Sequence, residues 1–279
     1  MRTIIKTVKG QATSDGAGVR LMRSIGTPQL SDLDPFLMLD EFKSDNPNDY
    51  IAGFPPHPHR GFETVTYMLA GSMEHQDNAG NKGFLTAGSV QWMTAGRGIV
   101  HSEMPKQENG LMWGFQLWVN LPAKQKMTAP RYQDIPPENI PEIHQPDGCK
   151  IRVIAGHALG KTGPVEGIVT QPLYLDVTIP ANGQFTHDLP EDHQAFVYVF
   201  EGQGNMGVTP ENNGTPLGIS TLGVLSQGTE FKVSTDSGTR YILLAAKPVK
   251  EPIVKYGPFV MNTFQEIEQA VRDYQRGLF

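Results

Sequence analysis

The sequence predicts an all-β protein with two domains of the sandwich or barrel type. Short runs of strand-forming residues recur along the chain, such as ETVTYML, MWGFQLWVNL, AFVYVFEG and RYILLAA, and clusters of Gly, Pro, Asn and Asp separate them. The 30 glycines and 22 prolines suit a chain of many turns better than a helical one. The length of 279 residues accommodates two hydrophobic cores, each in a domain of about 130 residues.

The distribution of prolines predicts the domain organisation. Residues 122–146 contain six prolines and no periodic apolar face, which predicts an ordered linker at residues 131–148. We therefore expect one domain at residues 1–130, with RTIIKTV as its first strand, and a second domain at residues 149–279. The runs ETVTYMLAGSM and AFVYVFEGQGN each end at a glycine turn, and this weak similarity suggests a duplicated β unit.

A single helix is expected at residues 263–276. Thr263 and Glu266 have the spacing of a capping box, and Gly277 can end the helix. Four apolar residues recur at helical spacing: Phe264, Ile267, Val271 and Tyr274. We expect this amphipathic helix to pack on the surface of the β structure, and a partner-binding helix is the alternative.

The composition argues against a nucleic-acid-binding protein and against a membrane protein. The net charge is −6 and no block of five or more Lys and Arg residues occurs, whereas direct nucleic-acid binding usually needs a basic stripe. No run of about 18 apolar residues occurs, so no transmembrane helix is expected. The chain start lacks the apolar region of a signal peptide, and the single cysteine, Cys149, permits no intrachain disulfide. These features favour a cytoplasmic protein.

The stretch PPHPH places two histidines on one face of an extended segment. Side chains at positions i and i+2 of a strand point to the same side, so His57 and His59 converge. Pro56 and Pro58 favour extended backbone, and Pro58 cannot donate a ladder hydrogen bond. The pair is therefore expected at a strand start or a sheet edge, where a cavity can open.

His101 and Glu103 repeat this spacing in TAGRGIVHSEMP, after a tight turn at Gly96 and Gly98. Hairpins in a barrel can bring the two pairs face to face, which collects three imidazoles and one carboxylate. Such ligands suit divalent Fe, Mn, Ni, Cu or Zn, and four of them leave two open positions in an octahedral site. A lone H-x-H motif is more often a surface feature, but two such pairs beside turns favour a metal site.

The other histidines carry weaker signals. His75 follows a strand and lies near a turn, so we interpret it as solvated or as part of the site mouth. His187 and His193 lie in the second half, which offers no later residue comparable to His101. We therefore expect one metal site, in the first domain, and none in the second.

Several motifs together resemble the pirin family of the cupin superfamily. These are DPFLMLDEF, PHPHRGFETVTY, QWMTAGRGIVHSE, QLWVNLP and GPFVMNT, and the resemblance runs from about Arg20 to about Val271. The spacing departs from the general cupin pattern, because four residues separate Gly96 from His101 where that pattern has two. The resemblance implies two antiparallel jelly-roll (cupin) domains packed face to face. It also implies an iron site in the first domain whose ligands are His57, His59, His101 and Glu103.

The resemblance implies two alternative functions. Some pirins resemble quercetinases and open the ring of flavonols such as quercetin with O₂, which predicts a metal-dependent oxidoreductase of the quercetin 2,3-dioxygenase type. Fe(II) is then the expected metal, with Zn, Mn, Ni, Cu and Co also compatible, and Glu103 is the expected general base. Five residues are expected to line the substrate cavity, with ordinary core packing as the alternative for each: Phe54, Met93, Trp113, Phe115 and Gln116.

Other pirins are regulators, so the alternative function is a metal- or redox-responsive protein that binds a protein partner without turnover. The acidic net charge favours a protein partner over DNA. Arg23 is a candidate surface contact for such a partner, although an ordinary solvated arginine is the simpler interpretation. A monomer is expected, because two packed cupin domains already bury the sheet faces that single cupin domains share in dimers.

Overall fold

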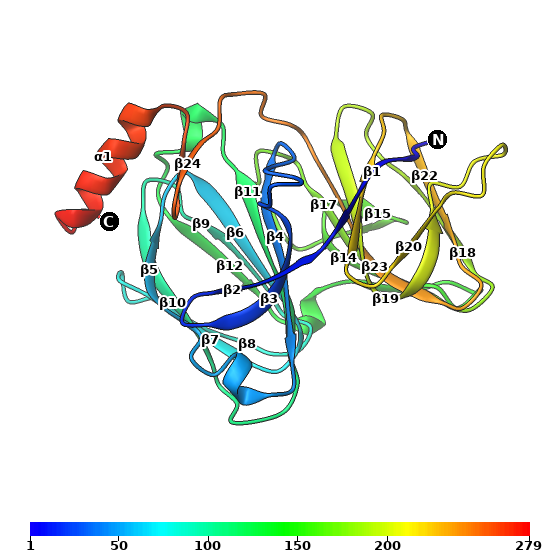
Figure 1. The fold of residues 1–279 in the computed structure, drawn as a ribbon, viewed down its shortest axis with the longest axis horizontal. Helices are drawn as coiled ribbons and strands as arrows, with labels where there is room; N and C mark the ends of the chain where they lie inside the picture. The colour runs from blue at the N-terminus through cyan, green and yellow to red at the C-terminus, as the bar shows by residue number, and fades with distance from the viewer. The chain divides into compact units, whose positions relative to one another are not determined.

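A computed structural model describes all residues from 1 to 279 and divides them into two compact units. The N-terminal unit comprises residues 11–137 and 249–279, and the C-terminal unit comprises residues 1–10 and 138–248. Strands form most of both units, and the single α-helix lies at the C-terminal end of the chain (Figure 1). The prediction of an all-β protein with two antiparallel β units and a short C-terminal helix is confirmed.

The N-terminal unit is a sandwich of two antiparallel sheets. The larger sheet has seven strands, in the order β12 (Arg131–Ile135), β9 (Val90–Thr94), β6 (Phe62–Ala70), β11 (Met112–Asn120), β4 (Phe36–Ser44), β3 (Val19–Ile25) and β2 (Gln11–Asp15). The smaller sheet has four strands, in the order β5 (Phe54–His59), β10 (Ile99–Pro105), β7 (Met73–Asp77) and β8 (Lys82–Leu85). The two sheets face each other, because Thr66 on β6 and Gln116 on β11 hydrogen-bond to Glu103 on β10.

The C-terminal unit repeats this strand order. Its longest path runs through β1 (Ile4–Lys9), β21 (Thr221–Leu225), β19 (Gln194–Met206), β23 (Thr239–Ala246), β17 (Leu173–Ile179), β14 (Lys150–Ala155) and β13 (Glu142–His144). The remaining strands are β18 (Gln184–Asp188), β22 (Glu230–Ser234), β20 (Thr215–Gly218), β15 (His157–Ala158) and β16 (Lys161–Thr162). The similar runs ETVTYMLAGSM and AFVYVFEGQGN begin in β6 and β19, and each of these strands is third in the strand order of its sheet. This correspondence supports the duplicated β unit.

The chain ends and the proline-rich segment differ from the predicted organisation. The boundary at residues 137 and 138 falls inside the predicted linker, but residues 1–10 and 249–279 each join the unit formed mainly by the other half of the chain. The segment 131–148 is also not only a connection, because β12 pairs with β9 and β13 pairs with β14. Pairing partners far away in the sequence decide both features, and no local pattern reveals them.

The C-terminal helix α1 (Phe264–Gln275) begins as predicted. The side chain of Thr263 accepts a hydrogen bond from the Glu266 backbone, and the Glu266 carboxylate accepts one from the Thr263 backbone, which completes the capping box. Ile267 and Ala270 are buried against the hairpin formed by β24 (Val254–Tyr256) and β25 (Phe259–Met261). Phe264 and Tyr274 were expected on this face, but both are exposed. No helix of this chain is long and apolar enough to cross a bilayer.

Lys126 is fully buried in the N-terminal unit and joins three segments. Its ammonium group donates hydrogen bonds to the carbonyl oxygens of Gly61 (2.7 Å) and Val260 (3.0 Å) and to Oδ1 of Asn120 (2.7 Å). Burial lowers the pKa of this lysine to about 8. Lys126 therefore connects the turn after β5, the end of β11 and the C-terminal segment next to the helix.

Replacing Lys126 by methionine is expected to lower the free energy of unfolding by roughly 2–4 kcal/mol, because three buried acceptors lose their donor. Urea unfolding, monitored by tryptophan fluorescence, measures this loss in the N-terminal unit, since all three tryptophans lie in that unit. Lys124→Met, at an exposed position two residues away, is the matched control and should change stability little. Equal unfolding curves for the two variants would contradict the assigned role of Lys126.

The lowered pKa of Lys126 also predicts a pH dependence of stability. Below pH 8 the lysine is charged in both the folded and the unfolded chain, and the folded state carries the full cost of burying the charge. Between about pH 8 and the ordinary value of 10.5 the folded state releases the proton first, so the free energy of unfolding rises with pH. The contribution is at most about 1.4 kcal/mol per pH unit. It should appear as the difference between the wild type and Lys126→Met over this range.

Candidate metal centre

The pairing of β5 with β10 brings the two histidine motifs together. In this antiparallel pair His101 lies opposite His57, and Glu103 lies opposite Phe54. The register shifts between these two positions, because β5 uses three steps where β10 uses two. The extra residue falls at Pro55 and Pro56, which cannot donate ladder hydrogen bonds.

The three histidines form a compact cluster. Their ligand nitrogens all lie within 4.8 Å of one another, and the Nε2 atoms of His57 and His59 are 3.0 Å apart. His101 is buried, and neither of its ring nitrogens has a hydrogen-bond partner in the protein. Metal–nitrogen bonds of about 2.1 Å place adjacent ligand atoms about 3 Å apart, so the cluster has the spacing of a metal site. A metal ion would also satisfy one of the two unpaired nitrogens of His101.

Burial keeps two of these imidazoles in the form that binds metals. It lowers the pKa of His59 and of His101 well below the ordinary value of 6.5, and the neighbouring imidazoles lower the pKa of both further. Both rings are therefore neutral at physiological pH. A neutral imidazole offers a lone pair to a metal ion without first losing a proton.

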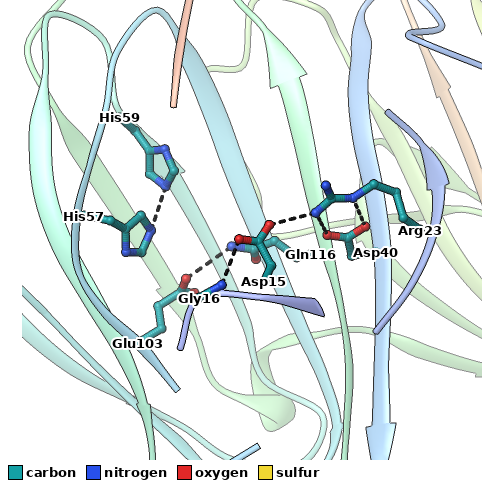
Figure 2. Close-up of polar contacts among 8 residues, drawn as sticks. All are labelled: Asp15, Gly16, Arg23, Asp40, His57, His59, Glu103 and Gln116. Carbon is teal, nitrogen blue, oxygen red and sulfur yellow. Dashed lines mark hydrogen bonds and ion pairs between the residues drawn. The ribbon is translucent and has the colours of Figure 1, made fainter. Parts of the chain in front are cut away.

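Glu103 lies next to the histidines but outside their cluster. Its Oε1 atom accepts a hydrogen bond from the Thr66 hydroxyl (2.9 Å), and its Oε2 atom accepts one from Nε2 of Gln116 (3.2 Å). Figure 2 shows the carboxylate directed toward Gln116, while His57 and His59 face each other. The structure thus brings the predicted carboxylate into the same cavity, where its hydrogen-bond partners belong to the opposite sheet.

The cavity beside the histidines has a volume of about 1010 Å³. It is bordered by His57, His59, Glu103 and two of the expected substrate contacts, Phe54 and Gln116. Most of its wall is apolar, and the apolar residues include Leu21, Leu37, Met38, Phe42 and Trp118. A flat aromatic molecule would fit such a space. Trp118 was not singled out from the sequence, although it lies two residues after Gln116 and therefore shares its face of the strand.

Three expected cavity residues lie elsewhere. Trp113 and Phe115 alternate with Gln116 along β11, so they point to the other face of the sheet, where Nε1 of Trp113 donates a hydrogen bond to Glu41 (2.8 Å). Met93 is buried in a small apolar cluster with Ala95 and Ile99. Alternation along β11 explains the positions of Trp113 and Phe115, whereas Met93 has the same parity as Gln91 on β9 and is covered by its apolar neighbours.

A row of polar side chains crosses the inner face of the larger sheet. Consecutive pairing partners place six of them at one level: Arg23, Asp40, Gln116, Thr66, Gln91 and Asp134. At one end Asp134 accepts a hydrogen bond from buried His75 (2.8 Å), which was expected to be solvated or at the site mouth. At the other end Arg23 forms a two-point ion pair with Asp40, and this pairing raises the pKa of the guanidinium. Arg23 is thus a cavity residue rather than a solvated surface arginine.

The second unit has only one histidine at the corresponding positions. There β18 pairs with β22, as β5 pairs with β10, and the buried residues of the two strands are Phe185, His187, Phe231 and Val233. His187 lies opposite Phe231, as His57 lies opposite His101, so no second imidazole faces it. The three apolar residues are part of one cluster that also contains the single cysteine, Cys149. Burial raises the pKa of this thiol to about 12, so it is unreactive at neutral pH.

Comparisons with known proteins agree with this architecture. Two family models match, one described as Pirin over residues 18–119 and one described as Pirin C-terminal cupin domain over residues 174–279. A Pseudomonas aeruginosa protein named "Putative quercetin 2,3-dioxygenase" is 51% identical, over 99% of this chain and 98% of its own length. A crystal structure of quercetin 2,3-dioxygenase from Acinetobacter baumannii is 35% identical with a TM-score of 0.91, and the match covers 100% of this chain and 98% of that one.

A more distant structure shares the fold. It is a bacterial pirin from Escherichia coli in complex with nickel(II), which is 20% identical with a TM-score of 0.67, and the match covers 89% of this chain and 100% of that one. The two family models together cover well over half of the sequence, and they fall on both units described above. This chain belongs to the pirin family.

Proposed function

We propose that this pirin is a metal-dependent dioxygenase that opens the ring of a flavonol such as quercetin with O₂. The observation that carries the proposal is the cluster of three histidines, with two nitrogens of His101 unpaired, at the wall of a largely apolar cavity of about 1010 Å³. The names of the relatives from Pseudomonas aeruginosa and Acinetobacter baumannii support the same chemistry.

The residues of the cavity have distinct roles in this proposal. His57, His59 and His101 hold a divalent metal, and Fe(II) is the proposed ion, although imidazole and carboxylate ligands also accept Zn, Mn, Ni, Cu and Co. A metal bound there supplies Lewis acidity and redox chemistry toward O₂. Glu103 accepts the proton of the flavonol 3-hydroxyl at a carboxylate oxygen, and it can complete the ligand set. Thr66 and Gln116 orient this carboxylate through their hydrogen bonds.

The overall reaction is balanced without a further co-reactant. Both atoms of O₂ enter the organic product, one carbon of the central ring leaves as carbon monoxide, and two ring bonds break. The apolar walls, including Phe54 and Trp118, hold the flat rings and exclude water from the reacting carbons.

The metal proposal predicts that His101→Ala lowers the bound metal at least tenfold from about one ion per chain, because one of three clustered imidazoles is lost. Anaerobic purification followed by elemental analysis measures this. His144→Ala removes an exposed histidine and should leave the metal content unchanged. A metal content that is equally high in both variants would place the metal elsewhere.

The catalytic proposal predicts sustained O₂ uptake and release of carbon monoxide when a flavonol is added. Glu103→Gln should lower kcat on the order of 100-fold, because the general base is lost while the side-chain volume is kept. An oxygen electrode measures the O₂ uptake, and a carbon monoxide assay measures the released gas. Glu108→Gln, at an exposed position on the loop after β10, is the matched control.

The outcomes separate the two candidate functions. Stoichiometric metal without any O₂ uptake on flavonols would refute the proposed substrate and favour the regulatory alternative. Full turnover by Glu103→Gln would remove the base role but leave the dioxygenase intact.

A further inference from the structure

The cavity of the three histidines has a second polar group, which the proposed chemistry does not use. Arg23 donates from Nε to Oδ1 of Asp40 (2.7 Å) and from Nη2 to Oδ2 of Asp40 (2.6 Å). The same Nη2 atom also donates to Oδ2 of Asp15 (2.8 Å). Figure 2 shows Arg23 and Asp40 on the opposite side of Gln116 from His57 and His59. All three residues border the cavity.

The sheet register sets the distance between this group and the proposed reaction centre. Arg23 pairs with Asp40, and Asp40 pairs with Gln116, so Arg23 and Gln116 are separated by two strand spacings, or about 10 Å between backbones. Gln116 contacts Glu103 directly. An aromatic compound of two or three rings that reaches Glu103 with one end can therefore extend its other end to Arg23.

The free hydrogen-bonding capacity of this group indicates what it recognises. Nη1 of Arg23 donates to no protein acceptor, and the side chain is 23% exposed. Asp15 is half-exposed, so its carboxylate can accept a further hydrogen bond. The three groups together carry one net negative charge, which disfavours an anionic ligand. A phenolic hydroxyl fits, because it can accept from Nη1 and donate to Asp15.

We propose that Arg23 and Asp15 form a distal subsite that binds a neutral hydroxyl group on the aryl ring remote from the reacting end of the substrate. The inference rests on the proposed flavonol chemistry and narrows the substrate class. It assigns Asp40 as the residue that positions the guanidinium. It predicts a preference for flavonols whose pendant phenyl ring is hydroxylated.

A purely structural ion pair would predict no such preference. Arg23 and Asp40 would then stabilise the packing of β3 on β4, and the ring substituents of a ligand would not matter. The two interpretations therefore differ in how ligand affinity depends on the hydroxyls of one ring.

The experiment compares two flavonols on the intact, metal-loaded protein under anaerobic conditions. Quercetin carries two hydroxyls on its pendant ring, and galangin carries none. Binding is followed by quenching of tryptophan fluorescence, since Trp118 borders the cavity, and by the change in flavonol absorbance on chelation. The wild type should bind quercetin about tenfold more tightly than galangin, which is the gain expected from one or two new hydrogen bonds.

Two variants test the subsite. Asp15→Asn leaves the ion pair between Arg23 and Asp40 intact and should reduce the preference to about threefold. The double variant Arg23→Met with Asp40→Leu removes the pair without leaving a buried charge, and it should reduce the preference, taken as the ratio of the two affinities in the same variant, to less than about twofold. Arg20→Met, an exposed arginine on the same strand, is the control and should keep the wild-type preference.

Each outcome decides between the possibilities. Equal binding of the two flavonols by the wild type, or an unchanged preference in both subsite variants, would overturn the distal subsite but leave the proposed function standing. Failure of the metal-loaded wild type to bind either flavonol would overturn the proposed function and the subsite together.

Discussion

The antiparallel pairing of β5 with β10 is the contact on which the candidate site depends. It places His101 opposite His57 and leaves an extra residue in β5 before the next pair. Glu103 lies two residues after His101 on β10, so its side chain also points into the sandwich, where Thr66 and Gln116 of the larger sheet hold its carboxylate. Residues from two distant motifs thus meet on one sheet, with three imidazoles in one cluster and the carboxylate beside it.

The larger sheet supplies the polar side of the same cavity. Interior faces of β sandwiches are usually apolar, and each buried polar group needs a partner. In this unit the polar residues lie in one row, so that neighbours on adjacent strands satisfy one another, as Arg23 does with Asp40 and Gln91 with Asp134. The row gathers several of the polar groups of a largely apolar cavity wall at one level.

The two units have the same fold, but only the N-terminal unit has the cluster of three histidines. The two units share their strand order, yet in the second unit His187 is the only histidine among the corresponding buried residues, and the others are Phe185, Phe231 and Val233. An apolar core stabilises such a sandwich by burial alone. In the first unit, His59 and His101 occupy buried positions at a cost in desolvation, which a bound metal would offset.

Local sequence patterns determined several features of this protein. These patterns are the alternation of polar and apolar residues, the spacing of proline and glycine, and the capping box. The all-β class, the helix at residues 263–276 and the convergence of His57 with His59 depend only on neighbours a few residues apart. Strand pairing decided the rest, because it joins residues that no local pattern relates. It placed residues 1–10 in the C-terminal unit and residues 249–279 in the N-terminal unit. It also decided which face of β11 borders the cavity, which excludes Trp113 and Phe115, and it brought Arg23 to the same cavity.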